Sequence, residues 1–153
     1  MEGFSVKTGN LFSQAKFVIL SFVILTCSAN TVYGQEKVGV LAVAIGTVKI
    51  INEEGTHKGK KGDSVYRNDT ITTGGKSRAQ VLLLDQTAIN ISQKATLILN
   101  SFVYGGDNDN IGVKVTKGTF RFISGKIATK KPENVNVETP VATIGVRGTE
   151  FLG

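Results

Sequence analysis

The sequence has little of what most enzyme and metal sites require. Its 153 residues include one cysteine, Cys27, one histidine, His57, and no tryptophan. One cysteine cannot form a disulfide within the chain, and one histidine cannot build a multi-histidine metal site. His57 lies in a basic loop, so we interpret it as a solvated loop residue rather than a catalytic base. Stability must therefore come from apolar burial and backbone pairing.

Catalytic motifs are also absent from the sequence. There is no Gly-x-Ser-x-Gly elbow, and no histidine is near Ser124-Gly125 in the sequence, so no serine has an evident activating base. Asp63, Asp69 and Asp85 could form paired carboxylates, but each occupies a turn position that favours a short acceptor for its own backbone. We predict no enzyme activity and no cofactor.

Two segments have the composition of ligand-binding loops without the required spacing. Residues 107–110 (Asp-Asn-Asp-Asn) are rich in oxygen ligands, but Ile111 takes the third ligand position and no glutamate closes the loop. Residues 74–77 (Gly-Gly-Lys-Ser) match the end of a phosphate loop, but the first glycine of that motif would fall at Thr70. We interpret both segments as turns and predict no metal site.

The formal net charge is +6, and lysines gather in two loop clusters, 58–61 and 126–131. Such clusters can meet an acidic partner such as an envelope polysaccharide or anionic lipid. Loop solvation and protection of strand edges is the interpretation we favour. Nucleic acid is not an expected partner, because the sequence carries no signature that combines basic and aromatic residues.

The first 34 residues have the pattern of a signal peptide. Lys7 and Lys16 precede an apolar stretch of 11 residues, 17–27. A membrane-spanning helix needs about 20 such residues, whereas the apolar region of a signal peptide needs about 7–15. We expect cleavage after Gly34 or, less neatly, after Ala29, and we weigh an uncleaved N-terminal anchor as the weaker alternative. The predicted organisation is a signal peptide over 1–34 and one β domain over 35–153.

Cys27 raises the alternative of a lipoprotein, in which a lipidated cysteine becomes the mature N-terminus. Thr26 precedes it, where glycine, alanine or serine is usual. We therefore expect Cys27 to leave with the leader, and we expect membrane association only if this cysteine is lipidated.

After the leader, apolar residues recur at alternate positions, which is typical of β-strands. Gly46 interrupts the first run and predicts a kink there. We expect 111–116 and 119–123 to pair as a hairpin across Lys117-Gly118, and 124–133 to form a connector that Pro132 keeps out of regular pairing. The expected strands cover 38–51, 64–66, 70–73, 78–84, 87–91, 95–99, 102–104, 111–116, 119–123 and 134–138.

Short strands with turns at intervals of about 8–12 residues indicate a sandwich, a barrel or a solenoid-like roll. The sequence has no strict repeat, which disfavours a regular β-helix. The strand 78–84 has apolar residues on both faces near its end, so we expect it to be central in a sheet.

Four segments, taken in order, resemble the FecR domain of bacterial cell-envelope proteins: 62–65, 69–74, 77–85 and 139–151. The resemblance covers about Val43 to Phe151. It implies an all-β fold, which we predict as a small twisted β-roll or solenoid-like sandwich of short, mostly antiparallel strands. The motif residues, to which the resemblance assigns structural or contact roles, are Gly62, Asp63, Asp69, Thr73, Gly74, Asp85, Thr139, Pro140, Arg147, Gly148, Thr149 and Phe151.

Two positions bear on how far this resemblance extends. The family pattern usually has Asp-Gly at one hairpin, where this sequence has Asp85-Gln86, which leaves the turn type open. Arg147 stands in an Arg-Gly-Thr stretch that recurs at the end of the family domain. We expect its guanidinium to clamp a carboxylate such as Asp69 or Asp85, with ligand contact as the alternative.

The resemblance implies a non-enzymatic, extracytoplasmic module, secreted across the inner membrane and located in the periplasm or at the cell surface. We expect it to bind another envelope protein by surface contact or by strand pairing. FecR regulators also carry an N-terminal anti-sigma segment and a transmembrane helix, which we do not find here, so sigma-factor control is not expected. The module often continues past the Gly-Thr-Glu-Phe segment, so we expect either an open sheet edge or a shortened family member.

The alternative function is a module that binds cell-wall or surface polysaccharide. Such a module would use exposed aromatic side chains, and the chain has three tyrosines and no tryptophan. Protein contact is therefore the preferred hypothesis.

Overall fold

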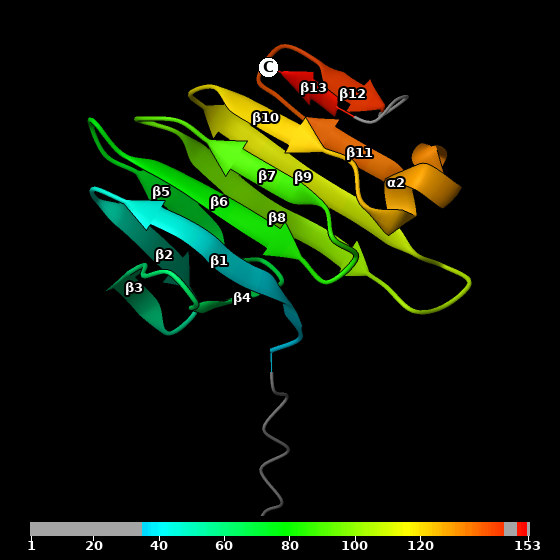
Figure 1. Ribbon diagram of the computed structural model, residues 1–153, viewed down its shortest axis with the longest axis horizontal. Coiled ribbons are helices and arrows are strands. Elements are labelled where there is room, and N and C mark those ends of the chain that lie inside the picture. Colours follow the sequence, from blue (N-terminus) through cyan, green and yellow to red (C-terminus); the bar gives the residue numbers. More distant parts are fainter. Residues whose placement is uncertain (1–34, 146–149, 153) are drawn as a thin grey trace, which may run out of the picture. The chain divides into compact units, whose positions relative to one another are not determined.

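The computed structural model describes residues 35–145 and 150–152, which form two stacked β-sheets (Figure 1). Within these residues, sheet A has the strand order β13-β10-β7-β6-β1-β4 and sheet B the order β12-β11-β9-β8-β5-β2-β3. Adjacent strands are antiparallel except β9 and β11, which are parallel. The predicted all-β fold of short, mostly antiparallel strands is confirmed. The predicted leader, 1–34, lies outside the described residues.

The strands have the following bounds. Sheet A contains β1 (Lys37–Ile45), β4 (Ser64–Tyr66), β6 (Arg78–Leu83), β7 (Ala88–Ile91), β10 (Phe120–Ile123) and β13 (Glu150–Leu152). Sheet B contains β2 (Val48–Asn52), β3 (Gly55–Lys58), β5 (Thr70–Thr73), β8 (Thr96–Val103), β9 (Asn110–Lys117), β11 (Val135–Glu138) and β12 (Thr143–Gly145).

Of the consecutive strands that run from one sheet into the other, four pairs lie side by side. They are β1-β2, β5-β6, β7-β8 and β9-β10, and neighbouring pairs hydrogen-bond in both sheets: β1 pairs with β6 while β2 pairs with β5. The two sheets are therefore largely one antiparallel meander folded over on itself. In the described chain, each fold line is crossed at a residue with positive φ: Gly46 (φ 76), Lys76 (φ 54), Lys94 (φ 54) or Gly118 (φ 85).

Gly46 breaks the first apolar run into β1 and β2, as its kink predicted. The hairpin expected across Gly118 is wrong: β9 pairs with β8 and β11 in sheet B, whereas β10 pairs with β7 and β13 in sheet A. The reason is a close contact with a residue distant in the sequence. Gly118 has a φ of 85, and a Cβ on it would lie 2.6 Å from the Cα of Ala95. The chain turns a corner there and does not reverse within one sheet.

Two further segments differ from the sequence pattern. The two strands expected at 95–99 and 102–104 are one strand, β8 (Thr96–Val103), whose pairing with β9 shifts register between Leu99 and Ser101. The expected connector contains a short helix, α2 (Lys126–Lys130), and a 3₁₀ turn, η1 (Pro132–Asn134). Among the described residues, no helix is both long and apolar enough to cross a membrane.

The core lies between the inner faces of the two sheets. Alternation along each strand points every second side chain inward, as in β6, where Ala79, Val81 and Leu83 are buried while Arg78 and Leu82 are exposed. Burial of a large apolar side chain contributes about 1.5–3 kcal/mol. Because the inward positions form the core, the outward positions of sheet A remain available to make a surface.

The turn between β6 and β7 contains Gln86, where the family pattern usually has glycine, and its hydrogen bonds define the turn type. The Gln86 amide donates to the Leu83 carbonyl (3.0 Å), and the Leu83 amide donates to the Thr87 carbonyl (2.9 Å). Only Gln86 in this turn has positive φ (73°). A three-residue loop with one left-handed residue, in place of the two that a type I′ turn requires, explains why this hairpin forms without the usual glycine.

We predict that Gln86→Gly stabilises the protein by about 0.5–1 kcal/mol, because glycine adopts positive φ without the Cβ clash and this gain exceeds its larger unfolded-state entropy. Urea unfolding measures the change. Gln86→Ala removes the side-chain amide but keeps Cβ, so it should give no gain; an equal gain in both variants would contradict the explanation.

Gly118→Ala should lower the free energy of unfolding by about 2–4 kcal/mol, since Cβ would collide with the Ala95 backbone at a positive φ. The matched control is Gly106→Ala, where a Cβ meets nothing within 4 Å. Urea denaturation of both variants checks this, and similar midpoints for the two would show that the corner at Gly118 does not constrain the fold.

Candidate functional site

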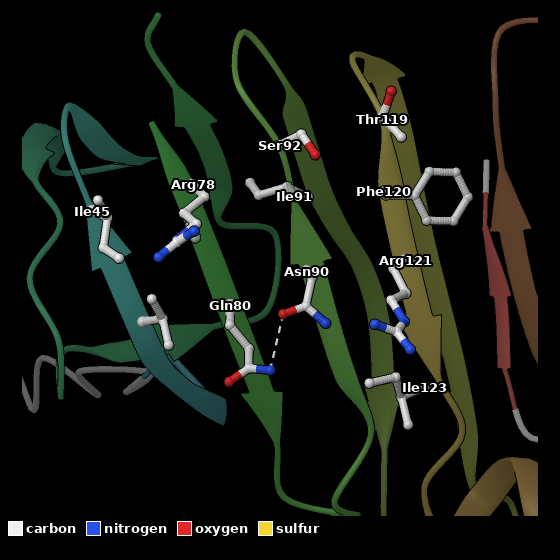
Figure 2. A pocket seen from close by; sticks show the side chains of 12 residues that line it. Ile45, Arg78, Gln80, Asn90, Ile91, Ser92, Thr119, Phe120, Arg121 and Ile123 are labelled. Atoms are coloured by element: carbon white, nitrogen blue, oxygen red, sulfur yellow. Dashed lines mark hydrogen bonds between the residues drawn. The ribbon is translucent and has the colours of Figure 1, made fainter. Parts of the chain in front are cut away.

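The outer face of sheet A is hollowed over β1, β6, β7 and β10. The hollow has a volume of about 690 Å³ and is open to solvent. Its walls combine outward-facing positions of four adjacent strands, which the pleat presents together on one face, with the buried residues Ala79, Ile91 and Phe120. Figure 2 shows the labelled side chains projecting from the strands around this groove.

A polar row crosses the middle of the groove. Gln80 of β6 lies opposite Asn90 of β7, which in turn lies opposite Arg121 of β10. The Gln80 Nε2 donates a hydrogen bond to the Asn90 Oδ1 at 2.9 Å (Figure 2). Arg78 precedes Gln80 on the same face of β6 and lies opposite Ile45 of β1. Two guanidinium groups thus line the groove on either side of a hydrogen-bonded amide pair.

An apolar row lies beside the polar row, two residues further along each strand. Val40, Leu82, Ala88 and Ile123 are successive cross-strand partners in this row. Leu82, which lies outside the lining of the groove, is 38% exposed, and Ile45, which lines it, is 43% exposed. Exposed aliphatic side chains next to cationic ones make the groove amphipathic.

The groove has the chemistry of a binding surface. Its lining residues, all within the described part of the chain, include no carboxylate and no histidine, so the hydroxyls of Ser92 and Thr119 have no base beside them there. In the described residues no group of three or more histidine, cysteine or acidic side chains could hold a metal ion. Arginine and amide N–H groups bind carboxylate, sulfate or phosphate oxygens.

The three aspartates identified from sequence all accept hydrogen bonds from backbone amides in turns. Asp63 Oδ2 accepts from the Lys60 amide (2.7 Å), Asp69 Oδ2 from the Tyr66 amide (2.8 Å), and Asp85 Oδ1 from the Thr87 amide (3.0 Å). These three turns follow β3, β4 and β6, and none of the three aspartates lines the groove.

Asp85 also holds the start of α2. It is fully buried, and its Oδ2 accepts hydrogen bonds from the Thr87 hydroxyl (2.8 Å) and the Ile127 amide (3.2 Å). The Asp85 carbonyl accepts from the Lys126 amide at 2.8 Å. Because Gly125, the N-cap residue, has no side chain to accept from these amides, the carboxylate and the carbonyl of Asp85, from a distant turn, do so.

Other motif residues stabilise corners and turns. The Thr73 hydroxyl accepts from the Ala95 amide (2.9 Å), and the Gly74 amide donates to the Thr47 carbonyl (2.8 Å). At the β11–β12 turn, which contains Pro140, the Thr139 hydroxyl accepts from the Ala142 amide (3.1 Å). These interactions tie neighbouring segments together at the ends of the strands.

The remaining motif residues lie elsewhere. Gly62 has a φ of 94°, and its amide donates to the Leu41 carbonyl (2.8 Å). Phe151 lies in β13 opposite Phe122. Arg147, Gly148 and Thr149 are outside the described residues, so the expected clamp onto Asp69 or Asp85 stays a prediction. The structure does not gather the described motif residues into one site.

Sequence reasoning missed the groove residues Arg78, Gln80, Asn90 and Arg121. The available signal was polar residues at outward positions of strands whose inward positions are apolar. Alternation places Arg78 and Gln80 on one face of their strand, but it says nothing about which strands are neighbours. The missing information was the register between strands.

Burial disfavours the charged form of the Asp69 carboxyl group. The carboxyl is 1% exposed, and its Oδ1 has no hydrogen-bond partner among the described residues. Burial raises the pKa of Asp69 above its ordinary value, and the hydrogen bond from the Tyr66 amide offsets part of that rise. Smaller charge effects come from His57, which lowers the pKa, and Glu54, which raises it.

A model of the family described as FecR protein matches residues 69–153, which is more than half of the chain. The match includes the polar row of the groove and excludes β1. No curated protein and no solved structure matches the chain.

The raised pKa of Asp69 predicts a pH-dependent loss of stability. The folded state holds the Asp69 proton more tightly than the unfolded state, whose pKa is about 3.9. This contribution is therefore present in acid and is lost as pH rises from about 4 through the folded-state pKa. Urea unfolding between about pH 4 and 8 should show wild type losing stability relative to Asp69→Asn. A pH-independent difference, or one of opposite sign, would contradict the assignment.

Proposed function

Because the chain belongs to the FecR protein family, we propose that it is an extracytoplasmic module that senses or binds another protein of the cell envelope without catalysing a reaction. FecR domains are typically non-enzymatic signalling or sensing modules and are usually periplasmic. The leader-like pattern over 1–34 supports export, with 35–153 as the mature domain.

The observation that carries the proposal is the amphipathic groove on sheet A. Exposed Ile45 lines the groove together with Arg78 and Arg121, and exposed Leu82 lies two residues from Gln80 on the same face of sheet A. Exposed aliphatic side chains together with arginine are features of protein-binding surfaces. The open edges of both sheets, such as β3 and β4, offer strand pairing as a second mode of contact.

Polysaccharide binding is the alternative function, and the surface favours it less. Among the described residues, Tyr104 is the one large aromatic side chain that is substantially exposed (38%), and it does not line the groove. A sugar-binding surface would instead present aromatic faces for stacking.

We predict that tagged protein captures a specific partner from envelope extract, and that Leu82→Asp reduces this capture at least fivefold, because the carboxylate would lie in the apolar row. Ile51→Asp is the matched control. The exposed fraction of Ile51 (37%) is similar to that of Leu82, but Ile51 lies in sheet B. Quantitative mass spectrometry of the captured proteins measures the effect. Recovery of no protein above background would overturn the proposed function. An equal loss of capture in both variants would show that this face of sheet A does not bind the partner.

A further inference from the structure

We propose that the edge along which sheet A folds into sheet B binds a linear acidic polysaccharide that carries one carboxylate on each sugar. The binding groups are Lys76, Lys94 and Lys117, which lie on three consecutive corners and which we call the basic ridge. None of these lysines lines the groove on sheet A. The inference therefore goes beyond the proposed function and does not depend on a protein partner.

The corners that carry the basic ridge lie directly side by side (Figure 1). The Lys94 amide donates to the Gly74 carbonyl at 3.0 Å, which joins the β7–β8 corner to the β5–β6 corner. The Ser92 amide donates to the Thr119 carbonyl at 3.0 Å, which joins it to the β9–β10 corner on its other side. Because neighbouring strands are about 4.7–4.9 Å apart, successive corners follow one another at that interval. The ridge is thus a line of cations on a rigid framework.

The geometry of the corners does not explain why lysines occupy them. Lys76 and Lys94 each have a φ of 54°, whereas Gly46 and Gly118 take positive φ at the other two corners. Lysine adopts this conformation less readily than glycine, and residues held in such conformations are concentrated at functional sites. The Lys76 amide is fixed by the Gln93 Oε1 (3.2 Å), while the side chains of both lysines are exposed. We infer that the charge of these side chains is what the corners require.

Charge is segregated along the strands that meet at the corners. The corner segments, 45–49, 74–78, 92–96 and 116–120, contain five basic residues and no acidic residue. Acidic residues lie instead at the opposite ends of the same strands: Glu53 follows β2, Asp69 precedes β5, Asp85 follows β6 and Asp109 precedes β9. The corner edge of the domain is therefore positively charged, which attracts an anionic ligand.

The lysines of the basic ridge have no acidic partner within the described part of the chain. On the outer face of sheet B, by contrast, Lys114 lies 3.7 Å from Glu138 in an ion pair. A hollow of about 400 Å³ beside the ridge is lined by Lys76 and Arg78, and its lining includes no carboxylate. The anionic groups that would balance these cations must come from a ligand.

The linear arrangement favours a polysaccharide among the possible polyanions. The interval between corners is comparable to the length of one sugar in an extended chain, so successive carboxylates can meet successive lysines. Ser92 and Gln93 also line the hollow, and the Gln93 Nε2 is a donor for sugar hydroxyls because its Oε1 is already bonded. Recognition of this kind rests on charge and hydrogen bonds and needs no exposed aromatic face.

Two other anionic partners fit the ridge less well. A membrane surface is planar and would meet cations spread over a face, whereas these cations follow one edge. Single-stranded nucleic acid is bound by stacking of bases on aromatic side chains. The aromatic residue of the corner segments, Phe120, is 2% exposed. Both partners are therefore included in the test as competing outcomes.

The test measures binding of fluorescein-labelled oligogalacturonate to the purified protein by fluorescence anisotropy. The matched neutral probe is the methyl ester of the same oligosaccharide, which keeps the sugar chain and removes the charge. At about 0.05 M salt the acidic probe should bind, and the ester should bind at least tenfold more weakly. Affinity for the acidic probe should fall as salt is raised to about 0.5 M, because salt screens exposed charges.

The double substitution Lys76→Gln with Lys94→Gln should weaken binding of the acidic probe at least fivefold, which is the loss expected for two exposed ion pairs. The matched control is Lys60→Gln with Lys61→Gln, which removes the same charge from an exposed loop between β3 and β4. The control should change affinity less than twofold. Since all four side chains are exposed, both double variants should keep the wild-type urea unfolding midpoint.

Several results would overturn the inference. They are no binding of the acidic probe at millimolar concentration, equal binding of its methyl ester, and equal weakening by the two double variants. Tighter binding to phosphatidylglycerol vesicles or to oligothymidylate than to oligogalacturonate would also overturn it, because the ridge would then recognise a membrane or a nucleic acid.

Discussion

The structure depends on one backbone constraint. The chain must turn a corner between the two sheets at each of the junctions β1-β2, β5-β6, β7-β8 and β9-β10. In the described chain the four corners each place a residue at positive φ, and two of those residues are lysines, which bear this conformation less easily than glycine. The corners are held by side-chain and backbone hydrogen bonds between neighbouring segments, such as the Thr47 amide with the Ser77 hydroxyl (2.8 Å). Without these corners, the apolar inner faces would remain open to water.

Folding the meander in two also produces the surface that we propose as a binding surface. Inward residues of β6, β7 and β10 enter the core, so their outward residues must share the opposite face of sheet A. There, Arg78, Gln80, Asn90 and Arg121 lie next to exposed aliphatic side chains. Such a surface offers charge, hydrogen bonds and apolar contact to the partner that we propose. The proposed function therefore depends on an exposed face of the fold.

The local strand predictions succeeded where the pattern depends on neighbouring residues alone. The strands 64–66 and 70–73 match β4 and β5, and the kink at Gly46 marks the first corner. The hairpin across Gly118 failed, because a glycine between two strands is compatible with a reversal in one sheet and with a corner between two. The contact between Gly118 and Ala95, which decides between them, joins residues far apart in the sequence. Helix α2 was missed for the same reason, since Asp85 and Thr87 supply its N-terminal hydrogen bonds from a distant turn.

By itself, the sequence determined the class of fold and the face on which each side chain lies, because alternation of apolar residues is a local property of an extended chain. It also determined that Asp63, Asp69 and Asp85 occupy turns, since a short acceptor bonds amides close to it in the chain. Only the tertiary structure decided that Gln80, Asn90 and Arg121 form one row. That row exists because β6, β7 and β10 are neighbours in a specific register. Register is set jointly by core packing and the positions of the corners, which no single strand encodes.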